Sequence, residues 1–177
     1  MCTTRRTWAC AGITLIELMV ALSILVLLLV LGVPQLSSLV VREREVTALN
    51  EIIGLLTAAR AEAVTARSGV SVCRRQEGTW SCDTSSNWSG GEVMAILDGD
   101  GDKTADGGER GVIRVFKPHA SLRYLSAVPF LRFNHLGFAS SSATIGICVD
   151  GRERAGRAVH VAKAGYLTKL EGWSECD

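Results

Sequence analysis

The chain has 177 residues, and its 19 Lys and Arg side chains against 18 Asp and Glu give a formal net charge of +1. This length allows one anchor helix and one modest domain with a single core. The balance of charge gives no general case for a nucleic-acid-binding protein, since such proteins usually carry a marked basic excess.

The first predicted element is an apolar helix at residues 13–33. Its 21 residues include one ionisable side chain, Glu17. A helix of that length, rising about 1.5 Å per residue, can cross the hydrocarbon core of a membrane. A carboxylate inside an apolar segment is costly, so Glu17 is a candidate functional residue that requires a cationic partner. The alternative is a simple anchor that tolerates one acid near its end.

A short basic leader at residues 1–12 precedes this helix and ends in a small residue, Gly12. An ordinary secretory signal is cut after its apolar region, whereas a cut at this glycine would precede it. The sequence from Gly12 to Leu18, GITLIEL, resembles the prepilin peptidase site of type IV pilins and type II secretion pseudopilins. It departs from that site in having Ile13 where phenylalanine is usual.

This resemblance implies how the protein is processed and assembled. Prepilin peptidase would cut between Gly12 and Ile13, and the new amino terminus at Ile13 would be N-methylated. The processed protein would lie in the inner membrane, with its head in the periplasm, until it joins a filament with other pilins or pseudopilins. In the filament the Ile13 amine of a neighbouring subunit would pair with Glu17. Because an unpaired buried charge is strongly destabilising, this pairing would select the subunit register.

A second helical segment is predicted at residues 34–68. Pro34 lacks the helical N–H, so we expect a kink or local loosening there, after which the helix resumes. Beyond it the apolar residues repeat at i, i+3, i+4 and i+7, which predicts one packed face. They are Leu49, Ile52, Ile53, Leu56, Ala59 and Ala63. Ser68 and Gly69 predict the end of the helix. The charged run at 42–45 favours a solvated face over an inter-subunit contact, because exposed ion pairs contribute little.

Residues 69–177 are predicted to form a head of short strands separated by glycine-containing turns. The expected strands are Val70–Arg74, Trp80–Cys82, Val93–Leu97, Val112–Phe116, Leu122–Tyr124, Leu131–Phe133, Thr144–Val149, Ala158–Val161 and Tyr166–Leu170. A helix followed only by antiparallel strands is an α+β arrangement. The expected fold is therefore a long amino-terminal helix, half transmembrane and half amphipathic, packed on an antiparallel β-sheet head.

The order of these features resembles the GspH/FimT branch of the minor pilins. The resemblance rests on the segment from Ala48 to Ala63, the strand ending in Cys73, Trp88, and a strand that runs from a Gly-Gly turn into Asp98. It implies the pilin fold and a role as a minor pilin of a type IV pilus. Within the same class, the alternative is a minor pseudopilin of type II secretion that serves protein export.

A single-span anchored envelope enzyme or sensor is the alternative from a different class. The pattern of Gly12 and Glu17 argues against it. The histidines His119, His135 and His160 show no metal-ligand spacing, and no Gly-x-Ser-x-Gly elbow accompanies the serines. The sequence therefore predicts a protein that is not an enzyme.

Of the 6 cysteines, two lie in the leader and the rest in the exported part. An even number in an exported domain predicts two disulfides, and the absence of a Cys-x-x-Cys pair argues against zinc or a redox motif. Four cysteines allow three connectivities. We favour Cys73 with Cys82, which would close a hairpin, and Cys148 with Cys176, which would hold the carboxyl end. Each bridge would contribute about 2–4 kcal/mol.

The loop at 98–109 is a candidate calcium site. Its acids occupy positions 1, 3, 5, 9 and 12, the spacing by which a twelve-residue loop surrounds calcium with oxygen atoms. They are Asp98, Asp100, Asp102, Asp106 and Glu109. Lys103 stands at the sixth position, where glycine is expected for the sharp turn, and no helix enters the loop. Acidic loops of this kind are also ordinary turns, so we favour a solvated hairpin and expect no cofactor other than this calcium candidate.

The second candidate site comprises Arg152, Arg154 and Arg157. Some FimT-like pilins take up DNA through a Gly-Arg-x-Arg motif near the carboxyl end, and Gly151 to Arg154 has that spelling. In the family the motif follows a late strand, whereas here it precedes one, and Glu153 dilutes its charge. A local basic patch is enough for phosphate contacts, so DNA is a candidate partner. A solvated turn is the favoured interpretation, because basic turns are common without nucleic acid.

Overall fold

The structure is a computed structural model that describes residues 14–149, 156–174 and 176, and only the backbone at residues 31–38. The sites predicted at Gly12, Ile13, Arg152 and Arg154 lie outside the described residues. The chain divides into two compact units, Met1–Val40 and Val41–Asp177. Both units contain part of one helix, α1 (Leu15–Thr65).

Helix α1 is 51 residues long. It begins after Thr14, whose carbonyl accepts the Leu18 N–H at 3.1 Å. The helix assignment continues through Pro34, because a proline removes one hydrogen bond from the ladder while its neighbours keep theirs. No helical stretch among the described residues combines the length and the apolar character that crossing a membrane requires.

The helix ends in a Schellman-type turn at Thr65. Ser68 donates its N–H to the Ala63 carbonyl at 3.2 Å, and Arg67 adopts a left-handed φ of 52°. This position is usually taken by glycine, which has no Cβ to strain it. The sequence placed the end at Ser68 and Gly69, later than the structure does, because a non-glycine residue closes the turn.

The second half of α1 buries the apolar face that the sequence predicted. Five of the expected residues are at most 3% exposed: Leu49, Ile52, Leu56, Ala59 and Ala63. Ile53 is only half-buried, while Leu55 is fully buried. Burying a side chain such as Leu or Ile contributes about 1.5–3 kcal/mol. This face is therefore the main attachment of the helix to the head.

Two antiparallel four-stranded sheets form the rest of the second unit. The first has the order β3-β2-β1-β5, with β1 (Val70–Arg74), β2 (Val93–Leu97), β3 (Val112–Phe116) and β5 (Phe130–Phe133). The second has the order β4-β6-β7-β8, with β4 (Leu122–Ser126), β6 (Ala143–Val149), β7 (Gly156–Val161) and β8 (Leu167–Trp173). A short 3-10 helix, η1 (Gly108–Gly111), leads into β3.

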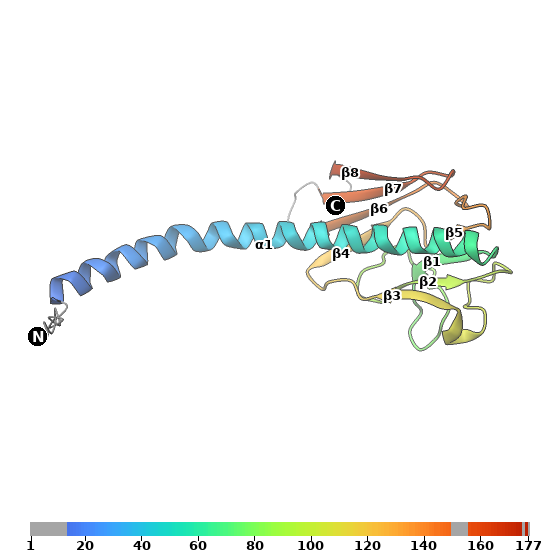
Figure 1. Ribbon diagram of the computed structural model, residues 1–177, viewed down its shortest axis with the longest axis horizontal. Helices are drawn as coiled ribbons and strands as arrows, with labels where there is room; N and C mark the ends of the chain where they lie inside the picture. The colour runs from blue at the N-terminus through green and yellow to red at the C-terminus, as the bar shows by residue number, and fades with distance from the viewer. Residues whose placement is uncertain (1–13, 150–155, 175, 177) are drawn as a thin grey trace, which may run out of the picture. The chain divides into compact units, whose positions relative to one another are not determined.

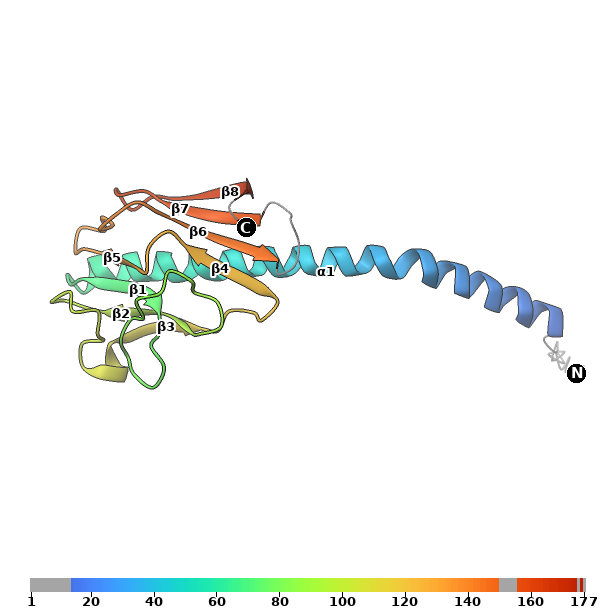
Figure 2. The same cartoon turned by 180° about the vertical axis from the view of Figure 1, so that it is seen from behind.

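Figures 1 and 2 show the two sheets on either side of the second half of α1. Side chains from the helix and from both sheets meet in one continuous core, which includes Trp88, Tyr124 and Phe133. Strand residues alternate between two faces, so a smaller cluster forms on the other face of the first sheet around Cys73, Met94 and Ile96. The α+β class is confirmed, but the head contains two sheets where the sequence suggested one.

The strand expected at Trp80–Cys82 is not formed. This segment makes two isolated bridges, Arg75 to Cys82 and Ser81 to Thr104. Each bridge joins it to a different neighbour, so no continuous ladder can grow along either one. The eight observed strands otherwise match the expected ones within a few residues.

The carboxyl end lies against the second sheet on the face opposite α1. The Trp173 ring covers Gly146 of β6 so closely that a Cβ at Gly146 would collide with it. Gly156 leaves room in the same way, since a Cβ there would lie 2.7 Å from the Cys176 sulfur. Two glycines thus make space for the last strand and for the disulfide that follows it.

Candidate functional site

The start of α1 carries the residue expected to act in assembly. Thr14 caps the helix, and its Oγ1 accepts the backbone N–H of Glu17 at 3.3 Å. The exposed Glu17 lies in the first turn, where the helix dipole favours a negative charge. Thr14 was not among the predicted site residues, although Thr-x-x-Glu is a known capping pattern. The cap fixes the helical position of Glu17 relative to the residues just before it.

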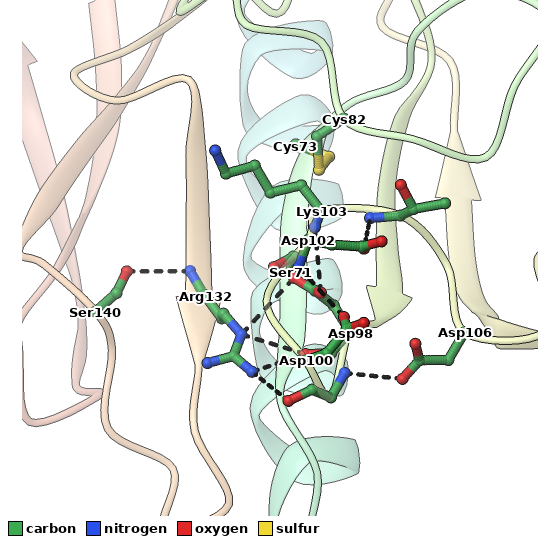
Figure 3. A network of polar contacts seen from close by, with 12 residues as sticks. Ser71, Cys73, Cys82, Asp98, Asp100, Asp102, Lys103, Asp106, Arg132 and Ser140 are labelled. Carbon is green, nitrogen blue, oxygen red and sulfur yellow. Dashed lines mark hydrogen bonds and ion pairs between the residues drawn. A yellow bond between two sulfur atoms is a disulfide. The ribbon is translucent and has the colours of Figure 1, made fainter.

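Asp98, the first acid of the 98–109 loop, is fully buried at the end of β2. Its Oδ1 accepts the Lys103 N–H at 3.2 Å, and its Oδ2 accepts the Ser71 hydroxyl. The Arg132 Nε lies 3.7 Å from the same Oδ2. Figure 3 shows these groups converging on one carboxylate from β1, β5 and the loop. Both oxygens of Asp98 are therefore occupied by protein groups.

The other aspartates of this loop accept backbone N–H groups of the same loop. Asp106 accepts from Gly99 at 2.8 Å, Asp102 accepts from Thr104 at 2.7 Å, and Asp100 accepts from Asp102 at 3.3 Å. Such bonds are typical of Asp in tight turns. The loop is thus closed by its own carboxylates.

The structure gathers only part of the predicted calcium set. Carboxylate oxygens of Asp98, Asp100 and Asp102 lie within 4.8 Å of one another. Asp106 is turned onto the Gly99 N–H, and Glu109 lies in η1, so neither belongs to this group. In this structure Asp106 and Glu109 are thus not gathered with the other three carboxylates, and calcium binding by the loop stays a prediction. The Arg132 guanidinium already supplies a positive charge to the group.

Arg132 also closes the network from the opposite side. Its Nη2 donates to the carbonyls of Asp98 and Gly99 at 2.8 and 2.9 Å, and its Nε donates to the Asp98 carbonyl at 3.2 Å. A Cβ at Gly69 would collide with this guanidinium. Arg132 therefore joins β5 to the end of β2 and to the chain that leaves α1. No sequence pattern marks Arg132, because its partners are mostly backbone carbonyls.

Of the predicted DNA-binding residues, Arg157 is the one that the structure describes. It lies on β7, and its Nη1 is 2.9 Å from Glu171 Oε1 on β8. Its guanidinium charge is therefore compensated within the sheet. Arg152 and Arg154 lie outside the described residues.

Both favoured disulfides are present. Cys73 is bonded to Cys82, with Cα atoms 5.5 Å apart, and Cys148 to Cys176, with Cα atoms 5.7 Å apart. The first holds the 80–82 segment on β1, which explains why that segment stays ordered without forming a strand. The second ties the end of the chain to β6.

Tyr124 is a buried polar group that the sequence analysis did not mark. Its hydroxyl has no hydrogen-bond partner among the described residues, and the residue is fully buried. Burial raises the pKa of the hydroxyl above its usual 10.0; a backbone group of His119 lowers the pKa, and the nearby Glu51 carboxylate raises it. An unsatisfied buried hydroxyl is destabilising, so Tyr124 is retained at some cost in stability.

Comparison with known proteins shows which family and which solved structures this chain resembles. The chain matches the family "Type II transport protein GspH" over residues 48–165. It is also similar to two crystal structures of the type IV minor pilin FimU from Pseudomonas aeruginosa PAO1. In space group P65 the TM-score is 0.54 at 21% identity, covering 71% of this chain and 92% of FimU. In space group P21 the values are 0.58, 20%, 74% and 91%. No curated protein matches the sequence.

At this level of identity the FimU likeness shows a shared fold, an amino-terminal helix packed on antiparallel sheets. The GspH match shows more, since it runs from the buried face of α1 to the turn between β7 and β8. Members of this family are structural, non-enzymatic components. Because the matched residues, 48–165, make up about two thirds of the 177-residue chain, the protein belongs to the GspH family of minor pilins and pseudopilins.

Proposed function

We propose that this protein is the precursor of a minor pilin or pseudopilin that is cut by prepilin peptidase between Gly12 and Ile13, anchored in the inner membrane, and built into a filament with other pilins or pseudopilins. The observation that carries the proposal is membership of the GspH family together with a helix capped by Thr14 and bearing Glu17 in its first turn. The apolar sequence at 13–33 supports the anchor.

In this proposal Glu17 selects the position of the subunit. Cleavage frees the amine of Ile13, and the Thr14 cap fixes the backbone N–H of Glu17 in the first helical turn. In a stacked filament the carboxylate pairs with the amine of a neighbouring subunit. An unpaired charge in an apolar core is strongly destabilising, so a subunit in the wrong register is rejected.

Mass spectrometry of the protein purified from the cell envelope tests the processing step. The amino-terminal peptide should begin at N-methylated Ile13, and a bulky residue in place of Gly12 should leave the leader attached. An envelope form that begins at Met1 in the unmodified protein would exclude this function.

A Glu17→Val variant tests the assembly step. It should be processed and inserted like the unmodified protein but recovered poorly from sheared filaments, because the amine of its neighbour then has no partner. Glu43→Val, a charge change within the second unit, serves as the matched control and should assemble normally. Normal recovery of Glu17→Val would remove the pairing mechanism while leaving the processing step intact.

The machine that the filament serves is the finer part of the proposal. We favour the type IV pilus, on the fold shared with FimU. Type II secretion is the second candidate, supported by the description of the matching family. Deleting the gene separates them: loss of surface pili with normal secretion supports the first, and loss of protein export with normal pili supports the second.

Binding of DNA by the head is a further part of the proposal that rests on the sequence at Arg152, Arg154 and Arg157. Arg157 is already paired with Glu171, so the other two would carry most of any phosphate contact. A gel-shift titration of the full chain in detergent decides the matter. Retardation that falls steeply with salt, and that is lost on replacing Arg152 and Arg154 by Ala, supports DNA binding; no retardation at high micromolar protein removes it.

A further inference from the structure

Large apolar side chains lie exposed on the head where α1 ends. We define the end patch as Val64, Leu136, Phe138 and Tyr166, which are 48, 62, 47 and 66% exposed. Among the described residues of the second unit, Leu170 is the one other exposed large apolar residue. An exposed apolar cluster on an otherwise well-packed domain usually marks an interaction surface.

Contacts between three segments bring the end patch together. Arg60 of α1 donates its Nε–H to the Gly137 carbonyl at 3.1 Å. A Cβ at Gly137 would lie 3.2 Å from Val64 Cγ2, and a Cβ at Gly165 would collide with the Gly137 carbonyl. The residues that flank these two glycines carry the other three side chains of the end patch. The helix end, the β5–β6 turn and the β7–β8 turn therefore form one surface.

The two turns are held in place by hydrogen bonds. The Asn134 Oδ1 accepts the N–H groups of Leu136 and Phe138, each at 3.0 Å. Ala139 donates its N–H to the Lys163 carbonyl at 2.9 Å, which ties one turn to the other. A surface whose backbone is already fixed loses little conformational entropy on binding. The backbone of the end patch is therefore already ordered before a partner binds.

The charges around the end patch are positive. Arg67 and Lys163 are exposed beside it, and Arg60 lies one helical turn before Val64. The turn segments at 134–140 and 162–166 contain no Asp or Glu. A second copy that placed its own end patch on this one would bring cations against cations, which disfavours self-association. Charge complementarity favours a partner that carries acidic side chains.

A groove beside the end patch indicates what kind of partner fits. The groove has a volume of about 520 Å³ and is lined by Asn134, Phe138, Ala139, Ser140, Lys163 and Ala164. The groove is shallow and its lining is mainly apolar, with Asn134 and Ser140 as its uncharged polar members, which suits the side chains of a folded protein. Phe138 and Tyr166 carry rings on which bases could stack, whereas Val64 and Leu136 do not, so nucleic acid is one of the outcomes that the crosslinking test below distinguishes.

We infer that the end patch docks a different protein, whose contact surface combines large apolar side chains with Asp or Glu. The inference goes beyond the proposed function, which concerns the first turn of α1. It assigns the opposite end of that helix to a specific protein contact.

Site-specific photo-crosslinking of the full chain in its native envelope tests the inference. p-Benzoylphenylalanine is placed at Leu136 or Tyr166, and at the exposed Thr79 as the matched control. Both end-patch positions should give an adduct with the same protein, and Thr79 should not. The crosslinked peptide of that protein should carry Asp or Glu next to large apolar residues.

Charge reversal supplies the second arm. Arg67→Glu with Lys163→Glu should abolish the adduct, whereas Lys117→Glu, an exposed control, should leave it unchanged. Equal thermal unfolding temperatures of these variants establish that the head remains folded. Adducts only with a second copy, with lipid or with nucleic acid, no adduct at either position, or an adduct that survives the double reversal would each overturn the inference. The crosslink reports a contact made by the head and does not report cleavage at Gly12. The inference and the proposed processing step can therefore fail independently.

Discussion

The two halves of α1 treat their apolar residues in opposite ways. From Leu15 to Val30 every side chain is exposed, with Leu15 at 78% and Leu28 at 65%. In the second half Ile52 and Leu56 are 0% exposed. The second half finds its apolar partners within the same chain, whereas the described residues provide none for the first half. The buried half therefore contributes to the stability of the head, whereas the exposed half does not.

Truncating one leucine in each half of α1 should give the largest difference in the unfolding free energy of the head. Leu56→Ala removes a fully buried side chain and should destabilise the head by up to about 5 kcal/mol, because the cavity cannot fully collapse. Leu25→Ala, at a residue that is 51% exposed, should leave the unfolding free energy of the head unchanged. Urea denaturation followed by the fluorescence of the buried Trp88 measures both. Equal destabilisation by the two variants would contradict the comparison.

Removing the second disulfide weakens the head without touching α1. Its cysteines are 28 residues apart, so the loop-entropy relation gives a loss of about 3.6 kcal/mol for Cys148→Ser with Cys176→Ser. The Cys73–Cys82 bridge closes only 9 residues, and its removal should cost about 1 kcal/mol less. Calorimetry of the two double variants ranks them. The opposite ranking would mean that local packing, and not chain entropy, decides the effect.

Asp98→Ala tests whether the buried network of the first sheet is structural. It leaves Ser71 and Arg132 without their shared acceptor, so we expect a loss of about 3 kcal/mol. Asp100→Ala is the matched control, since the residue is exposed and accepts one turn hydrogen bond. The midpoints of denaturant unfolding of the two variants measure the loss, provided that their m-values are equal. Similar midpoints for the two variants would show that Arg132 holds the loop through backbone carbonyls alone.

Tyr124 makes the stability of the head depend on pH on the alkaline side. Burial raises the pKa of its hydroxyl, so above pH 10.0 the unfolded chain loses a proton that the folded chain keeps. Stability is therefore fully present below that pH and falls as pH rises through the folded pKa. Tyr124→Phe should remove this dependence and change stability at pH 7 by no more than about 1 kcal/mol. Unfolding measured from pH 8 to 12 provides the check, and an unchanged alkaline slope in the variant would assign it to other groups.

Calcium should have the smallest effect of all. The carboxylates of the 98–109 loop already accept protein hydrogen bonds, so 1 mM calcium should add less than about 0.4 kcal/mol, the value for half-saturation. Thermal unfolding with calcium and with a chelator measures the difference. A larger stabilisation that disappears in Asp100→Asn with Asp102→Asn would establish a calcium site.

Sequence periodicity predicted the regular parts of this fold because it reports burial. Leu49, Ile52 and Leu56 recur at helical spacing, and each lies in the core. In β1, Val70 and Cys73 lie on opposite faces, as the alternation of a strand requires for residues three apart. The division into two sheets could not be predicted, because it depends on which strands pair, and pairing is set by contacts between distant segments.

The candidate sites also divide into those that a local sequence pattern reveals and those that depend on contacts between distant segments. Glu17 was recognised because a charge in an apolar run is anomalous in any fold. Asp98 was noticed for its spacing, but its burial against Ser71 and Arg132 required knowledge of how β1, β2 and β5 lie together. Arg132 itself acts through backbone carbonyls, which every sequence contains. The end patch assembles from the end of α1 and two turns that are distant in the sequence, and none of the three segments alone marks a site.

The two disulfides also set how far this chain can be extended by force. A filament under tension pulls on its subunits, and an unfolding head would ordinarily lengthen by roughly 3.3 Å for each residue released. The bridges exclude segments of 9 and 28 residues from that extension. Roughly 120 Å of chain therefore stays folded back on itself under load, at about 3.3 Å per residue. In a stretched subunit, extension would not proceed into the two loops closed by disulfides. The 80–82 segment would stay linked to β1, and the carboxyl end would stay linked to β6.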